Sequence, residues 1–94
     1  MSYYPMSDWK LSGFVKSNAK NKKYTAIIRS GNKIKKIHFG DSRYEQYKDS
    51  SGLGLYSKLD HGDSKRRASY KSRHSGFIKD GFYSAGYFSM NYLW

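Results

Sequence analysis

The sequence has no cysteine and only one proline in 94 residues. The lack of cysteine excludes a disulfide framework and a thiolate zinc site, so aromatic packing or a partner has to hold a small core together. No apolar run reaches the length that spans a membrane, and the N-terminal residues lack the basic and apolar regions of a secretory signal. We therefore expect no membrane partner and an intracellular setting.

Acidic residues are scarce as well: 7 Asp and Glu stand against 18 Lys and Arg, which gives a formal net charge of +11. Such an excess predicts a polyanionic partner, of which nucleic acid is the natural example. Aromatic residues make up 18% of the chain, whereas disordered basic tails contain few of them. The length therefore predicts one small domain with a packed core.

Two alternating runs of apolar and polar residues, separated by a Ser-Gly-Asn sequence at 30–32, predict an antiparallel β-hairpin over residues 23–39. Gly and Asn supply the positive φ values that a tight turn requires. The second strand would present Lys33, Lys35 and His38 to solvent and so make one face of the sheet basic.

Helix-capping residues predict three short helices, over residues 42–48, 64–74 and 85–93. Asp41 or Ser42 would cap the first, Asp63 or Ser64 the second and Ser84 the third. Residues 1–22 show no sustained period and predict an irregular N-terminal arm, from which Met6, Trp9, Leu11, Phe14 and Val15 could still cover the core. The predicted fold is α+β, with one small basic domain at 23–94. The uncharged residues 81–94 are expected to be buried, and Leu53, Leu55 and Tyr56 are further core candidates.

The predicted helix at 64–74 carries most of the functional argument. Residues three and four apart share a helix face, so Arg66, Tyr70, Arg73 and His74 lie along one side and Arg67, Lys71 and His74 along the next. The helix has little apolar surface, so it must pack through Tyr70 and the arginine stems or be stabilised by what it binds. Clustered Arg and Lys displace counterions from phosphates, and the guanidinium fork fits phosphate oxygens. The candidate nucleic-acid-binding residues are Lys33, Lys35, Lys36, Arg66, Arg67, Tyr70, Lys71, Arg73 and His74.

Two other interpretations of the same region stay open. The arginines could instead pair with acids and tie the helix to loops, the candidates being Asp41, Glu45, Asp49, Asp60 and Asp63. Tyr44, Tyr47 and Tyr70 could stack on single-stranded bases or could pack within the protein. Packing is the more common role of such tyrosines.

A metal site would need Asp60, His61, Asp63 and His74 to converge. This group faintly resembles the histidine-metal finger of small nucleases, but it lacks histidines four residues apart on one helix and the cysteine knuckles. We therefore expect no metal, no cofactor, no catalytic residue and no enzymatic activity. His61 is expected to form loop hydrogen bonds, and His74 to end the helix.

The segments "KKIHFGDSRYEQYKD", "GLYSKLDHGDSKRRASYKSRH" and "SAGYFSMNYLW" together resemble a family of small basic proteins of unestablished function. These proteins are encoded by large DNA viruses of protists and algae, with looser relatives in tailed phages. The resemblance covers residues 35–94 and rests on Phe39-Gly40-Asp41, Tyr44, Tyr47-Lys48-Asp49, Asp60-His61, Asp63, Arg66-Arg67, Tyr70, Arg73-His74, Ser84-Ala85-Gly86 and Leu93-Trp94. It implies a viral origin, and with it a place in the virion or in the infected host cell.

The leading hypothesis from the sequence is a non-enzymatic nucleic-acid-binding protein of low sequence specificity, with DNA expected in preference to RNA. The first alternative is a virion structural or minor capsid protein that acts through contacts with other virion proteins. The second is a small metal-dependent nuclease. One continuous basic face would favour nucleic acid, whereas basic patches interrupted by exposed apolar groups would favour protein contacts.

Overall fold

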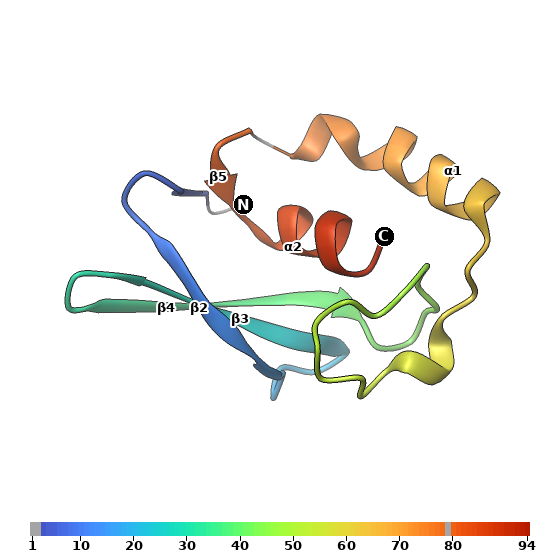
Figure 1. Ribbon diagram of the computed structural model, residues 1–94, viewed down its shortest axis with the longest axis horizontal. Helices are drawn as coiled ribbons and strands as arrows, with labels where there is room; N and C mark the ends of the chain where they lie inside the picture. The colour runs from blue at the N-terminus through green and yellow to red at the C-terminus, as the bar shows by residue number, and fades with distance from the viewer. Residues whose placement is uncertain (1–2, 79) are drawn as a thin grey trace.

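The computed structural model describes residues 3–78 and 80–94, and shows an α+β fold as predicted. A three-stranded antiparallel sheet has the strand order β2-β3-β4, and a two-stranded sheet pairs β1 with β5. The elements are β1 Tyr4–Pro5, β2 Lys10–Lys16, β3 Lys22–Ser30, β4 Lys33–Asp41, the 3-10 helix η1 Ser57–Leu59, α1 Ser64–His74, the 3-10 helix η2 Ser75–Phe77, β5 Phe82–Tyr83 and α2 Ala85–Tyr92. In Figure 1, α2 lies between the three-stranded sheet and α1.

The predicted hairpin is confirmed as β3 and β4. Ser30 pairs with Lys33, so Gly31 and Asn32 form the turn, and Gly31 supplies the positive φ of 58°. Along β3, Tyr24, Ala26 and Ile28 are all fully buried, because alternate residues of a strand point to the same face.

The C-terminal helix packs on this face. Ser84 caps α2 as predicted, since its hydroxyl accepts a hydrogen bond from the Tyr87 amide at 3.1 Å. Phe88 is fully buried and Leu93 is 1% exposed, as predicted, whereas Trp94 and most of the other residues at 81–94 are only partly buried. The Phe88 ring contacts Phe39 and Phe14 at centroid distances of 5.5 and 5.8 Å, so aromatic packing provides much of the cohesion.

The prediction of an irregular arm was wrong for residues 10–16, which form β2 at the edge of the main sheet. A register shift between Leu11 and Gly13 breaks the alternation along this strand, so its sequence shows no regular period. Trp9, Leu11 and Phe14 pack against the core as expected, but Val15 is 45% exposed.

The predicted helix at 42–48 is absent, and this stretch is a loop that forms a bridge from Gln46 to Asp60. The Gln46 side chain is fully buried and bonded to groups far along the chain, and these tertiary contacts outweigh the local preference for a helical turn. Leu53 and Leu55 are exposed, contrary to prediction, whereas Tyr56 packs against the core.

Helix α1 begins and ends where the sequence predicted. The Asp63 side chain caps it by accepting from the amides of Lys65 and Arg66 at 2.9 and 3.2 Å. No residue of α1 is buried, so few apolar contacts attach it to the rest of the protein. Within the described ranges, no helix is both long and apolar enough to cross a membrane.

Candidate functional site

A column of stacked rings attaches α1 to the C-terminal segment. The Tyr70 ring lies between Trp94 and His74, at centroid distances of 4.2 and 4.0 Å and with interplanar angles of 5° and 18°. His61 contacts Trp94 at 5.1 Å. Tyr70 therefore supplies the anchoring contact that the sequence required of a helix without an apolar stripe.

Two arginines of α1 have structural partners. Arg67 donates from Nε to the backbone carbonyl of Trp94 at 2.6 Å, and its guanidinium lies 4.7 Å from the centroid of the Tyr47 ring. Arg66 pairs with Glu45 at 3.0 Å on the surface. The prediction that acids could tie the arginines to loops is therefore confirmed for Arg66, whereas Arg67 is held by an aromatic ring and a carbonyl.

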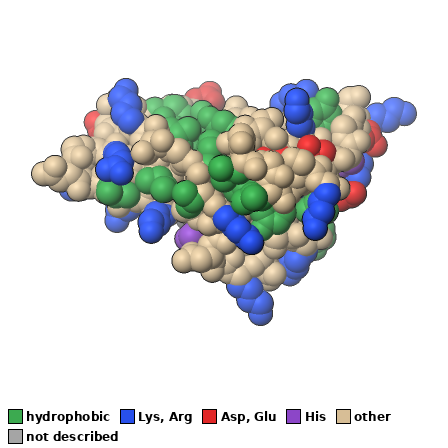
Figure 2. All heavy atoms as spheres, turned by 60° about the horizontal axis from the view of Figure 1, so that its bottom comes forward, with side chains coloured by type: hydrophobic (Ala, Val, Ile, Leu, Met, Phe, Trp, Pro, Cys, Tyr) green, Lys and Arg blue, Asp and Glu red, His purple; other side chains and the backbone are tan. Residues whose placement is uncertain are grey.

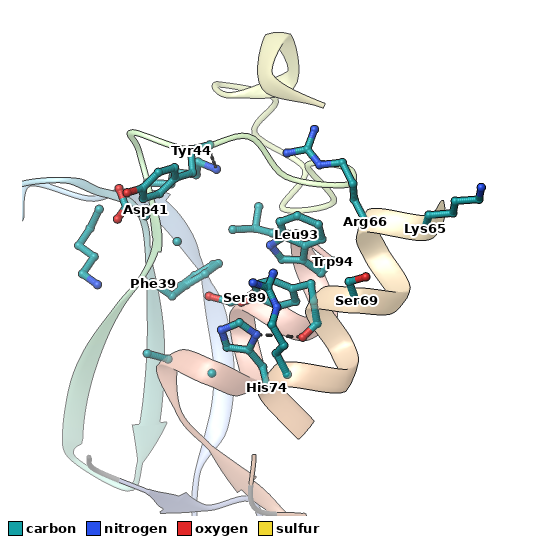
Figure 3. A pocket seen from close by; sticks show the side chains of 17 residues that line it. Phe39, Asp41, Tyr44, Lys65, Arg66, Ser69, His74, Ser89, Leu93 and Trp94 are labelled. Carbon is teal, nitrogen blue, oxygen red and sulfur yellow. Dashed lines mark hydrogen bonds between the residues drawn. The ribbon is translucent and has the colours of Figure 1, made fainter. Parts of the chain in front are cut away.

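A pocket of about 740 Å³ lies between α1, α2 and the base of the β3–β4 hairpin, at the opposite end from its turn. Figure 3 shows Asp41 and Tyr44 on one side of it and Ser69 and His74 on the other. Lys65 and Arg66 extend outward from α1 at the rim. The basic residues that line this pocket are Lys22, Lys23, Lys65, Arg66, Arg73 and His74.

A buried polar network fixes the wall that faces α1. Lys23 is 2% exposed, and its Nζ donates to the Tyr44 carbonyl at 2.8 Å and to Gln46 Oε1. The amide of Gln46 donates onward to Asp60 Oδ1 at 2.6 Å. Burial lowers the pKa of Lys23, while the nearby carboxylates of Asp41, Asp49 and Asp60 oppose this shift. This network holds the backbone of the 42–60 loop against the sheet.

Glu45 pairs with Arg66 of α1, but three further acids are bound by other groups. Asp63 caps the helix, Asp49 accepts from Tyr24 and from backbone amides, and Asp41 is bound by Arg43 in a two-point contact at 2.8 and 3.0 Å. The hydrogen bonds from Arg43 lower the pKa of Asp41 from 3.8 to about 2. The basic side chains around the pocket therefore keep most of their positive charge uncompensated.

A second hollow of about 310 Å³ lies on the other side of α1. Arg67 and Lys71 line it together with Lys48, Tyr47 and Trp94. The helix therefore presents Arg66, Tyr70, Arg73 and His74 to the larger pocket and Arg67 and Lys71 to the smaller one. This is the division that helical spacing predicted, except that His74, which was expected on both sides, lines the larger pocket.

The structure does not bring Lys33, Lys35 or Lys36 to either pocket. The hairpin tip lies at one end of the long axis of the molecule, which extends 40 Å, and α1 lies toward the other end (Figure 1). Lys33 and Lys35 share the face of Ile37, whereas Lys36 and His38 point to the opposite face. The expectation that Lys33, Lys35 and His38 form one basic face was therefore wrong.

Three lysines and a tyrosine that line the pocket were absent from the predicted set of binding residues: Lys22, Lys23, Lys65 and Tyr44. Lys65 belongs to the series 65, 69, 73 at four-residue spacing, so the helix period could have identified it. Lys22 and Tyr44 come from the base of the hairpin and the loop after it, and local sequence gives no signal for their approach to α1. Of the three tyrosines considered for base stacking, Tyr44 is the most exposed, at 64%.

His61 and His74 lie at opposite ends of the ring column and do not converge. The Asp63 amide donates to His61 Nδ1 at 2.9 Å, so Nε2 carries the proton, and Nε2 is buried with no hydrogen-bond partner among the described residues. The Nδ1 of His74 donates to the Tyr70 carbonyl at 2.9 Å. Over residues 3–78 and 80–94, no three potential ligands among His, Cys, Asp and Glu are grouped closely enough to hold a metal.

Comparison with known proteins yields one match. Residues 13–51 are similar to a family of unknown function, DUF5754. The matched segment holds fewer than half of the residues, including β3, β4 and the loop with Tyr44 and Gln46, and it omits both α-helices. No curated protein and no solved structure matches the chain.

Proposed function

We propose that the protein binds nucleic acid, without catalysis and with low sequence specificity, through phosphate contacts made by α1. The observation that carries this proposal is that Arg73, Lys65 and Lys71 have no acidic partner among the described residues, although they line or border the two pockets. Unpaired Lys and Arg side chains can replace the counterions that are condensed on nucleic-acid phosphates. This costs them least, because no ion pair within the protein has to be broken first.

The other predicted binding residues differ in their contacts within the protein, and we assign them different roles on that basis. Arg66 can contact phosphate at the rim after giving up an exposed ion pair, which costs little. Arg67 and Tyr70 hold α1 in place, so they act by positioning the helix. Lys33, Lys35 and Lys36 form a separate basic region that a long polyanion could reach at the other end of the molecule. The sequence contains no base-reading motif, so little preference among sequences is expected, and DNA is the partner to test first.

A second function is favoured by the sheet surface. Figure 2 shows that Lys and Arg side chains on this face stand apart, with hydrophobic and uncharged atoms between them. Val15 and Ile34 are 45% and 49% exposed. Interrupted charge of this kind is typical of protein contacts, so a structural role beside other virion proteins is the alternative proposal, in line with the resemblance to small viral proteins.

The test is a filter-binding titration with DNA over a range of salt concentrations, on wild type and on Arg73→Gln and Lys71→Gln. Each substitution should weaken binding to different sequences equally and flatten the slope of log affinity against log salt by about 0.9 for duplex or 0.7 for single strands. Lys58→Gln is the control, because it removes the same charge from an exposed position outside both pockets. Identical slopes in all four proteins would reject α1 as the phosphate-binding surface.

A further inference from the structure

We infer that the pocket between α1 and the hairpin receives an unpaired nucleotide, with its base stacked on Tyr44, so that the protein favours single-stranded over duplex nucleic acid. This inference rests on the proposed function and names the form of nucleic acid that the site takes. A volume of about 740 Å³ falls within the range of about 300 to 1,000 Å³ typical of small-ligand pockets.

Tyr44 is the most exposed aromatic side chain that lines this pocket, at 64%. Both faces of Tyr70 are covered by Trp94 and His74, Trp94 also contacts His61, and Phe39 is fully buried. The Tyr44 side chain is exposed at the pocket edge, and the guanidinium of Arg43 approaches its ring at 5.6 Å. A base stacked on the face of Tyr44 that Arg43 does not approach would displace water and would leave the protein's own ring contacts in place.

The backbone of Tyr44 is fixed before any ligand arrives. Its carbonyl accepts from the buried Lys23 Nζ, and its amide donates to the Asp41 carbonyl at 3.2 Å. A ring on a fixed backbone loses little conformational freedom on binding, so more of the stacking energy contributes to affinity.

The charges around the pocket suit the phosphates on either side of such a base. Arg73 and Lys65 of α1 both line the pocket, Lys65 at its rim, and neither has an acidic partner within the described ranges. Asp41 is the acid that lines the pocket, and Arg43 binds both of its carboxylate oxygens. The cavity therefore offers one ring and several cations to a single nucleotide unit.

A base inside a duplex is covered on both faces by its neighbours, so a protein ring can stack on it only after it leaves the helix. The phosphates of a duplex could still contact the cations at the rim. The inference therefore predicts that stacking adds affinity for single strands alone.

The experiment compares an oligothymidylate with a duplex of equal length, using wild type, Tyr44→Ala and Tyr44→Phe in isothermal titration calorimetry. Loss of one base–aromatic stack should weaken single-strand binding by Tyr44→Ala about 5- to 150-fold. Duplex affinity and the salt slope should stay unchanged, because tyrosine carries no charge. Tyr44→Phe keeps the ring and should bind within about twofold of wild type. Because the ring is exposed, all three proteins should melt at similar temperatures.

The possible results separate this inference from the proposed function. If wild type binds both nucleic acids and Tyr44→Ala binds the single strand with the same affinity, the stacked base is rejected, while the proposal of phosphate binding by α1 still stands. An equal loss for single strand and duplex would also reject it, because it would show a general effect on the pocket. Failure of wild type to bind either nucleic acid would overturn both proposals.

Discussion

Replacing Tyr70 by alanine should release α1 while the sheet and α2 stay folded. The stack on Trp94, 4.2 Å between ring centroids, is the aromatic contact that crosses from α1 to the C-terminal segment. Such a pair contributes about 0.5–1.5 kcal/mol beyond burial. Partial burial of the ring adds about 0.8–1.5 kcal/mol, which is half the value for a fully buried aromatic side chain. The total of about 1.3–3 kcal/mol corresponds to a roughly 10- to 150-fold larger equilibrium constant for local opening of α1.

Hydrogen exchange of the backbone amides in residues 68–74 measures this opening directly. A helix of 11 residues is marginal in isolation, so a detached α1 should lose its protection, whereas the amides of β3 should keep theirs. Tyr70→Phe is the matched control, because it preserves the stacked ring. Unchanged protection of α1 in Tyr70→Ala would show that the ring column does not hold the helix, and a uniform loss across the sheet would show that α1 is part of the main cooperative unit.

Two further predictions concern the end of β4. Gly40 has a φ of 76°, and a Cβ there would lie 2.7 Å from the Leu93 side chain, so Gly40→Ala should cost about 1–3 kcal/mol for backbone strain and about as much again for overpacking. Urea unfolding should show a clearly smaller loss for Gly52→Ala, which has a φ of 87° but open space around it. Because the folded pKa of Asp41, about 2, lies below its ordinary 3.8, its stabilising contribution is complete above pH 3.8 and is lost as the pH falls through 2. Arg43→Ala should move the carboxyl pKa in an NMR titration back toward 3.8, and an unmoved value would rule out the Arg43 contact as its cause.

The elements that the sequence predicted correctly are those whose determinants are local. The hairpin follows from alternation and from a Gly-containing turn, and α1 and α2 follow from the capping side chains of Asp63 and Ser84. The division of the α1 side chains between two pockets also follows from the helix period alone.

The elements that it missed depend on distant partners. Strand β2 becomes recognisable only beside β3, and the 42–60 loop takes its path from the bonds of Gln46 to Lys23 and Asp60. The larger pocket is lined by residues of α1, α2 and the β3–β4 hairpin, which lie far apart in the sequence. Local spacing therefore could not predict which basic residues line this pocket together. Lys33, Lys35 and Lys36 were grouped with α1 on charge alone.

The position of Trp94 gives the protein a built-in optical reporter. Its indole stacks on Tyr70, contacts His61 and lines both pockets, so detachment of α1 or entry of a ligand changes the polarity around it. Indole emission responds to that polarity. Trp9, the other tryptophan, packs beside Tyr4 away from both pockets and would give a nearly constant background. Movements of the helix can therefore be followed by intrinsic fluorescence in the unlabelled protein, with Trp94→Phe to assign the signal.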